Sequence, residues 1–216
     1  MNISKRTFGN KMFWINKRLF DIFICLLLIP LFFIISIILL FVNYFFNSGS
    51  LFFIQERMGK NCSVFSAVKF RTMVPVKEIT RKYDDPIEIN RITSFGKILR
   101  RTRIDELPQI LNVLKGDMSL IGPRPLRVHY LPYYTQKESI RHSIRPGITG
   151  LAQVSGRNLL SWDEKLLLDI KYVDTMSFKT DSIILFQTIK KIFVTNNIEL
   201  DLNMPDLDDE RRHKLI

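Results

Sequence analysis

The sequence predicts a mainly α-helical α+β protein with a membrane segment at its N-terminus and a small membrane-associated head. Three observations predict this class. An almost wholly apolar run extends from Ile22 to Val42, two short strand-like stretches follow it, and most of the remaining chain has apolar residues at helical spacing. We expect residues 1–46 to hold the basic N-terminal segment and the membrane segment, residues 47–198 to form the head, and residues 199–216 to be a loose polar tail.

Two strands are predicted directly after the membrane segment. Leu51 to Arg57 and Ser63 to Arg71 are short, rich in β-formers and separated by a turn at residues 58–61. We expect a small β-hairpin whose second strand ends near Lys69, a residue that is either surface charge or part of a site.

Several helices are predicted in the rest of the chain. Ser94 to Arg103 suits a short helix, and Ser161 with Glu164 has the spacing of a capping box that opens another. Asp181 to Val194 is amphipathic, so it either packs on a core or lies in a membrane interface.

Composition restricts the partners. The formal net charge of +11 indicates an anionic partner such as membrane lipid, nucleotide or nucleic acid. Cys25 and Cys62 are unlike a disulfide framework and favour a reducing compartment. Histidines 129, 142 and 213 are isolated, without the spacing of a metal site, and are predicted to be ordinary surface residues.

The stretch from Arg100 to Pro125 is where we expect chemistry. Its apolar spacing predicts a helix that ends at Gly116, with an inner stripe of Leu107, Ile110, Leu111 and Leu114. Asp105 and Glu106 then lie in the first turn, where a carboxylate interacts favourably with the helix dipole and with unpaired N–H groups. An ionised aspartate can be a nucleophile, and the alternative is that Asp105 is only an N-cap.

Arginines surround these acids in the sequence. Arg100, Arg101 and Arg103 precede them, and Arg124 follows in a loop that two prolines restrict. Planar guanidinium groups at a helix N-terminus suit a phosphate or diphosphate. The alternative for the upstream arginines is a surface that faces solvent or lipid headgroups.

Two glycine-rich loops carry further arginines. Arg145 opens the loop 145–150, and Arg157 lies in Gly156 to Asn158. Glycines let backbone and guanidinium groups approach an anion closely, so we predict that these loops contribute to anion binding.

Six ordered sequence blocks resemble one known family. They are KRLFD at 17–21, KFRTM at 69–73, IDELPQ at 104–109, GDMSLIGPRP at 116–125, RPGITG at 145–150 and GRN at 156–158. Together they resemble the bacterial sugar transferases, also called monotopic phosphoglycosyl transferases, over nearly the whole chain.

The resemblance implies a reaction. A sugar 1-phosphate would pass from a UDP-sugar to undecaprenyl phosphate, giving undecaprenyl-diphosphate-sugar and UMP, as the first membrane step of a bacterial glycan pathway such as exopolysaccharide or lipopolysaccharide synthesis. It implies Asp105 as the nucleophile and a ligand of Mg²⁺, with Glu106 as its assistant. By the same resemblance, phosphate or nucleotide contacts would come from Lys69, Arg100, Arg124, Arg145 and Arg157.

The resemblance also bears on the membrane segment. At about 1.5 Å per residue, the apolar run just matches a bilayer core of roughly 30 Å, but Pro30 divides it into arms that are too short to span alone. Basic residues before Ile22 place the N-terminus in the cytoplasm, so a straight span would export the head. Family members carry a re-entrant helix-break-helix, usually with Ser-Pro at the break, where this chain has Ile29-Pro30. We therefore predict a membrane hairpin and a head at the cytoplasmic face of the bacterial inner membrane.

The partners that follow are undecaprenyl phosphate, a UDP-sugar and membrane lipid, with no nucleic acid. A homodimer and downstream glycosyltransferases are left open as further partners. Two other classes of function are kept as alternatives. One is a non-catalytic basic membrane adaptor, and the other is a lipid-linked phosphatase that would release phosphate without forming UMP.

Overall fold

The computed structural model describes residues 11–46, 49–74, 91–156, 159–194 and 206–212. In chain order the elements are α1 (Lys11–Phe46), β1 (Phe52–Met58), η1 (Lys60–Cys62), β2 (Val64–Phe70), α3 (Ser94–Thr102), η2 (Ile104–Glu106), α4 (Gln109–Lys115), β3 (Ser119–Ile121), η3 (Val128–Tyr133), η4 (Glu138–Ser143), β4 (Gly147–Thr149), α5 (Leu151–Ser155), α6 (Trp162–Thr175), α7 (Phe178–Val194) and α8 (Leu207–Arg212). The η elements are short 3-10 helices. The predicted class, mainly α-helical with small sheets, is confirmed.

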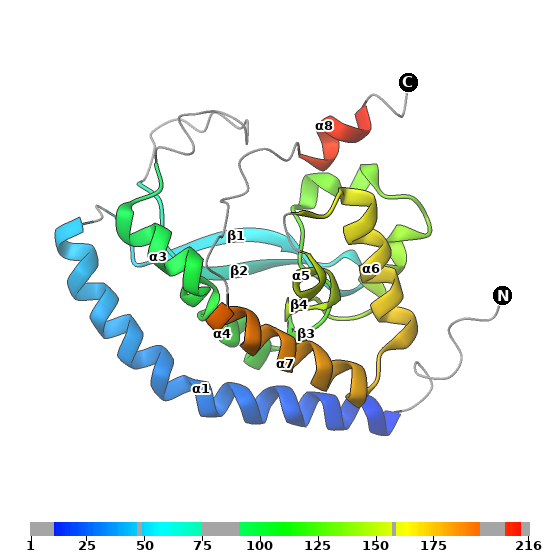
Figure 1. Ribbon diagram of the computed structural model, residues 1–216, viewed down its shortest axis with the longest axis horizontal. Coiled ribbons are helices and arrows are strands. Elements are labelled where there is room, and N and C mark those ends of the chain that lie inside the picture. The colour runs from blue at the N-terminus through cyan, green and yellow to red at the C-terminus, as the bar shows by residue number, and fades with distance from the viewer. Residues whose placement is uncertain (1–10, 47–48, 75–90, 157–158, 195–205, 213–216) are drawn as a thin grey trace.

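Helix α1 is continuous, and it is not divided into two separate arms. Pro30 lies inside it, and Figure 1 shows α1 bent in its middle as it runs along one side of the head. Proline removes a backbone hydrogen bond and clashes with the preceding turn, which accounts for a bend. The predicted break at Pro30 is therefore wrong, because the helix continues through this residue. By its length and composition, α1 could cross a membrane.

The two faces of α1 have different surroundings. On one face, the ring of Phe32 stacks with Phe52 and Phe70 of the hairpin, and Phe13 contacts Phe178 of α7. On the other face, large apolar side chains are more than half exposed, among them Leu27, Phe33, Ile37 and Phe41. An apolar surface of this extent is typical of a site that contacts a membrane or another protein.

The predicted hairpin is confirmed. Strands β1 and β2 pair antiparallel, with Phe52 opposite Phe70 at the open end. The side chain of Asn112 joins β2 to α4, because its Nδ2 donates to the carbonyl of Ser66 at 2.8 Å and its Oδ1 accepts from the backbone N–H of Val68 at 3.1 Å. This contact fixes the end of β2 that leads to Lys69.

A second, parallel pair of strands was not predicted. Ser119 of β3 pairs with Gly147 of β4, and Ile121 pairs with Thr149. A Cβ atom on Gly147 would lie 2.1 Å from the backbone nitrogen of Gly122, so the glycine is needed for close packing. Residues 147–149 are therefore a strand and not part of the predicted loop, while the contribution of residues 145–150 to anion binding stays a prediction.

The helices of the C-terminal half agree with their sequence signals. Ser161 and Glu164 form the predicted capping box at the start of α6, and α7 includes the predicted amphipathic segment. In the predicted stripe of α4, Ile110 is buried, but Leu111 is 40% exposed and Val113 takes the inner position.

The predicted loose tail is wrong for residues 207–212. Leu207 of α8 is fully buried, and Arg211 forms 2.7 Å ion pairs with Glu138 and Asp163. These contacts hold α8 on the side of the head away from α1 (Figure 1). The rest of the predicted tail, 199–205 and 213–216, lies outside the described residues.

His142 is buried, contrary to the prediction of a surface residue. Burial and the charge of Arg141 lower the pKa of His142 to about 4, although a hydrogen bond with the backbone of Gly59 opposes them. As the pH falls, the imidazole of this histidine is protonated in the unfolded chain, where its pKa is about 6.5, before it is protonated in the folded state.

We expect this histidine to make the fold less stable in acid. Its contribution is fully present above pH 6.5 and is lost as the pH falls from about 6.5 to about 4, since the unfolded state is then protonated before the folded state. Melting temperatures measured across this range should fall less steeply for His142→Gln than for the parent. Equal slopes in the two proteins would contradict the assignment.

Candidate active site

The two predicted catalytic acids lie in η2, between α3 and α4. Helix α4 begins only at Gln109, with Pro108 before it, so the acids occupy a 3-10 turn and the prediction that they lie in the first helical turn is wrong. Asp105 makes no capping hydrogen bond, which removes the N-cap alternative. Arg103 ends α3 in the left-handed region at φ 63° and turns the chain into η2.

Glu106 is held by three cationic side chains. Its Oε1 accepts from Lys69 Nζ at 2.7 Å and from Arg124 Nη2 at 2.8 Å, and its Oε2 lies 3.3 Å from Arg103 Nη1. Burial would raise the pKa of Glu106, but the charges of Arg124, Lys69 and Arg103 outweigh it and hold this pKa well below its usual range. Glu106 is therefore an anion that organises the cations.

Asp105 has a different environment. The residue is 9% exposed, and its Oδ1 is buried with no hydrogen-bond partner among the residues that the structure describes. Burial, followed by the charge of Glu106, raises the pKa of Asp105, whereas Lys69, Arg103 and Arg100 lower it. A buried carboxylate oxygen without a partner is available to a ligand, and a carboxylate of raised pKa is more basic than an ordinary one.

The structure gathers part of the predicted phosphate-binding set. Lys69 and Arg124 meet on Glu106, and Arg100, whose charge acts on Asp105, donates from Nε to Thr72 Oγ1 at 2.8 Å. Arg145 is directed elsewhere, because its Nε donates to the carbonyl of Gly116 at the end of α4. It lines a small cavity beside the N-terminal half of α1. Arg157 lies outside the described residues.

Two arginines of the site were absent from the predicted phosphate contacts. Arg103 was noted among the arginines before the acids, and its spacing of three residues from Glu106 could have identified their ion pair. Arg141 is 2% exposed, donates to the backbone carbonyl of Arg124 at 2.6 Å and forms an ion pair with Asp169 at 2.7 Å. No local pattern reveals Arg141, since its partners are distant in the sequence.

Asp105 also fits the role of magnesium ligand predicted from the sequence. Mg²⁺ is commonly held by one or two carboxylates together with substrate phosphates, and the buried, unpartnered Oδ1 is a suitable donor. Glu106 does not fit this role, because cations occupy both of its oxygens. A separate His129, Asp206 and Asp208 group has ligand atoms within 4.8 Å of one another, but Asp206 already pairs with Arg127.

Comparison with known proteins identifies the family. The family described as "Bacterial sugar transferase" matches residues 12–195, which include all of α1 except its first residue, and both acids. The chain belongs to the bacterial sugar transferase family. The resemblance of the six blocks is thereby confirmed, and the protein is an enzyme of the phosphoglycosyl transferase class.

The curated relatives differ in length. The uncharacterized sugar transferase EpsL of Bacillus subtilis is 44% identical over 190 residues, which cover 86% of this chain and 91% of the relative. The undecaprenyl-phosphate galactose phosphotransferase of Salmonella typhimurium is 36% identical over 82% of this chain, but over only 40% of its own length. An N-acetylgalactosamine phosphotransferase of Aeromonas hydrophila, named for UDP-N-acetylgalactosamine and undecaprenyl phosphate, is 37% identical over 82% of this chain and 43% of the relative. This transferase chain therefore corresponds to less than half of those two proteins.

Proposed function

We propose that this transferase moves a sugar 1-phosphate from a UDP-sugar to undecaprenyl phosphate through a covalent intermediate on Asp105. One observation carries the proposal: a buried aspartate with an unpartnered oxygen lies beside a glutamate that binds three cations. The cations favour a diphosphate, and the aspartate supplies a nucleophile. The names of the Salmonella and Aeromonas relatives both support undecaprenyl phosphate as a substrate, and that of the Aeromonas relative also supports a UDP-sugar.

The reaction balances in two displacements. In the first, an Asp105 carboxylate oxygen bonds to the sugar-linked phosphorus, and the bond between that phosphorus and the bridging oxygen breaks. UMP leaves with the electron pair. In the second, an oxygen of undecaprenyl phosphate attacks the same phosphorus, and the aspartyl bond breaks. The carboxylate of Asp105 is restored, and the product is the sugar diphosphate of the lipid.

Glu106 is a positioning residue in this proposal. Because its pKa is held well below the usual range, it does not carry a proton at neutral pH. It holds Lys69, Arg103 and Arg124 in one cluster, where their charge can stabilise the phosphates and the leaving UMP. The lipid phosphate needs little base catalysis, since a monoester with a second pKa near 6 is mostly dianionic at pH 7. Phosphoryl transfer depends chiefly on such positioning and charge neutralisation.

Magnesium belongs to the proposal as a resident ion. When bound, it would neutralise phosphate charge and polarise the phosphoryl oxygens. Asp105 is the residue of this chain that would hold the ion, because its buried Oδ1 has no partner among the described residues. The charges of Lys69, Arg103 and Arg100 favour the ionised form of Asp105 and oppose burial and the charge of Glu106, which raise its pKa.

We further propose that α1 enters the bilayer from the cytoplasmic face and returns to it. The bend of α1 and its exposed apolar face support partial insertion with the head against one leaflet (Figure 1). The basic residues before the apolar run favour a cytoplasmic N-terminus. A head on the same face has access to nucleotide-sugars.

The native cysteines provide a test of this topology. Cys62 lies on the head and is exposed, whereas Cys25 is buried in α1. In a Cys25→Ala protein, we expect Cys62 to resist a membrane-impermeant thiol reagent on intact cells and to react after permeabilisation. An added Asn2→Cys reporter should behave in the same way. Labelling of Cys62 on intact cells would place the head outside and remove the proposal.

An activity assay tests the reaction. Detergent-purified protein is incubated with undecaprenyl phosphate and a panel of UDP-sugars, and UMP and lipid products are followed. We expect UMP and a lipid diphosphate-sugar in equal amounts with at least one donor. Phosphate release without UMP would indicate a lipid-linked phosphatase, and binding of anionic lipid without turnover of any donor would indicate an adaptor. Either result would overturn the proposed reaction.

A further inference from the structure

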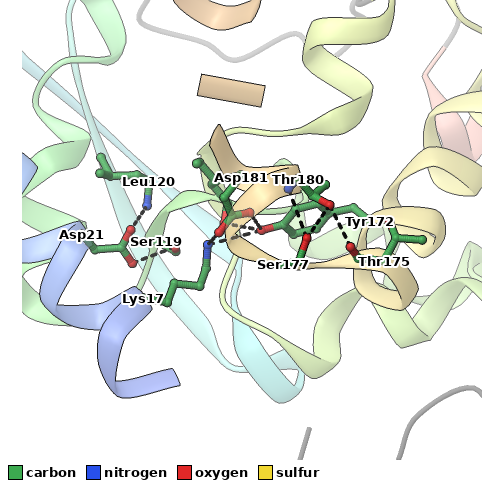
Figure 2. A network of polar contacts seen from close by, with 10 residues as sticks. Lys17, Asp21, Ser119, Leu120, Tyr172, Thr175, Ser177, Thr180 and Asp181 are labelled. Carbon is green, nitrogen blue, oxygen red and sulfur yellow. Dashed lines mark hydrogen bonds and ion pairs between the residues drawn. The ribbon is translucent and has the colours of Figure 1, made fainter. Parts of the chain in front are cut away.

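Lys17 and Asp21 of the block at 17–21 lie away from the proposed chemistry, yet they are buried. Lys17 is 5% exposed and Asp21 is 2% exposed, although both belong to a helix with a widely exposed apolar face. Figure 2 shows their side chains pointing from α1 toward β3 and α7. Charged groups are rarely buried unless they are paired, so the partners of Lys17 and Asp21 inside the head indicate what these residues do.

Asp21 binds the free edge of β3. Its Oδ2 accepts from Ser119 Oγ at 2.8 Å, and its Oδ1 accepts from the backbone N–H of Leu120 at 3.1 Å (Figure 2). The opposite edge of β3 pairs with β4. There the N–H of Ser119 donates to the carbonyl of Pro146, just before β4, and the N–H of Gly122, just after β3, donates to Thr149. The Asp21 carboxylate therefore takes the place of a third strand, because it accepts from the backbone N–H of Leu120, which would otherwise be buried without a partner.

Strand β3 leads directly to Arg124. Only Gly122 and Pro123 separate its last residue from this arginine. The backbone N–H of Gly122 donates to Thr149 at 2.9 Å, and the carbonyl of Pro123 accepts from Gly147 at the same distance. With so little slack between them, a displacement of β3 moves the Arg124 guanidinium relative to Glu106, which it meets at 2.8 Å.

A second contact secures the same half of α1. Lys17 Nζ pairs with Asp181 Oδ2 of α7 at 2.6 Å, and the Tyr172 hydroxyl lies 2.7 Å from Asp181 Oδ1. The three side chains form the buried cluster at the centre of Figure 2. This link holds α1 to α6 and α7, so it fixes the place from which Asp21 reaches β3.

We infer that Asp21 is a positioning residue for Arg124, through which the membrane helix sets the geometry of the active site. The inference rests on the proposed function, in which Arg124 contacts the phosphates. Asp21 does not touch substrate. It acts by fixing the edge of β3, and a loss of that contact leaves Arg124 present but misplaced.

A double-mutant cycle separates this role from general stability. Asp21→Ala removes both contacts to β3 and should lower kcat/KM for the UDP-sugar about ten- to hundredfold, since small misplacements at a phosphoryl-transfer site are costly. Arg124→Ala alone should cause a loss at least as large. In the double variant, Asp21→Ala should lower kcat/KM little below the value of Arg124→Ala alone, because the effects of coupled residues are not additive. Asp21→Asn, which keeps the acceptor for Leu120, should retain part of the activity.

Cys25→Ala is the matched control. Cys25 lies one helical turn beyond Asp21, is fully buried and makes no hydrogen bond to β3. It should lower the melting temperature, with an effect on kcat/KM that multiplies with that of Arg124→Ala.

If Asp21→Ala does not fold, Ser119→Ala removes one of the two donors to Asp21. It should show a smaller loss of kcat/KM with the same non-additivity. Multiplicative losses for Asp21 and Arg124 would overturn the inference while leaving the proposed function intact. An Arg124→Ala protein of full activity would instead contradict the proposed role of Arg124 itself.

Discussion

Replacement of Asp105 by asparagine should lower sugar-phosphate transfer by at least about a thousandfold, because the amide has the shape of the carboxylate but cannot form the bond to phosphorus. The folded state should not suffer. Burial and the charge of Glu106 raise the pKa of Asp105, so its ionised form is held at some cost to stability. We expect a melting temperature equal to the parent or slightly above it, as is common when a strained catalytic charge is removed.

The control for this variant is Asp117→Asn. Asp117 pairs with the largely exposed Lys115 at the end of α4, at 3.2 Å, and its Oδ2 accepts from Asn112 Nδ2 at 3.4 Å. Asparagine keeps an oxygen that can accept from Asn112, and an ion pair with an exposed lysine contributes little. The replacement of Asp117 should leave turnover within about twofold of the parent. Substantial turnover by a folded Asp105→Asn protein, verified by mass to be free of deamidated product, would contradict the covalent mechanism.

Replacement of Arg141 by methionine should produce the largest loss of stability, about 3–5 kcal/mol. The arginine is 2% exposed, and it donates from Nε and Nη2 to Asp169 Oδ2 at 3.0 and 2.7 Å. Methionine fills much of the space but leaves Asp169 as an uncompensated buried charge. It also removes the donor to the backbone carbonyl of Arg124, so activity should fall as well.

Denaturant unfolding in detergent measures this effect, and a double variant provides its control. Arg141→Met with Asp169→Leu removes both charges, so much of the stability should return, because paired buried ions are often replaceable by apolar groups. The lost support of Arg124 should persist, and activity should remain low. A single variant within about 1 kcal/mol of the parent would show that the pair is not needed for folding.

The sequence predicted those parts of the fold that local patterns determine. The hairpin follows from two strand-like stretches around a turn, and the start of α6 follows from the spacing of Ser161 and Glu164. Asp105 and Glu106 could be selected because paired acids beside arginines are chemically unusual. Their meeting with Lys69 and Arg124 depends on the packing of β2, α4 and β3, which periodicity does not describe. The family resemblance supplied that association.

The errors share a physical cause, which is long-range packing. Gly147 was interpreted as a source of loop freedom, whereas its missing Cβ allows the backbone of Gly122 to approach. Residues near Leu207 are polar in composition, yet one buried leucine and the ion pairs of Arg211 fix a helix there. His142 is isolated in sequence and buried in space. Pro30 was expected to break a helix that instead bends and continues, with contacts to the head along its length.

The most direct test of the central claim is a mass measurement on the peptide that contains Asp105. The protein is mixed with its UDP-sugar in the absence of undecaprenyl phosphate, quenched in acid within one turnover and digested. We expect up to one equivalent of UMP for each enzyme molecule and a phosphosugar mass on this peptide, which disappears when the lipid phosphate is added before the quench. Both signals should be absent from Asp105→Asn. Formation of UMP only when both substrates are present, with no modified peptide, would show direct transfer between them and contradict the account.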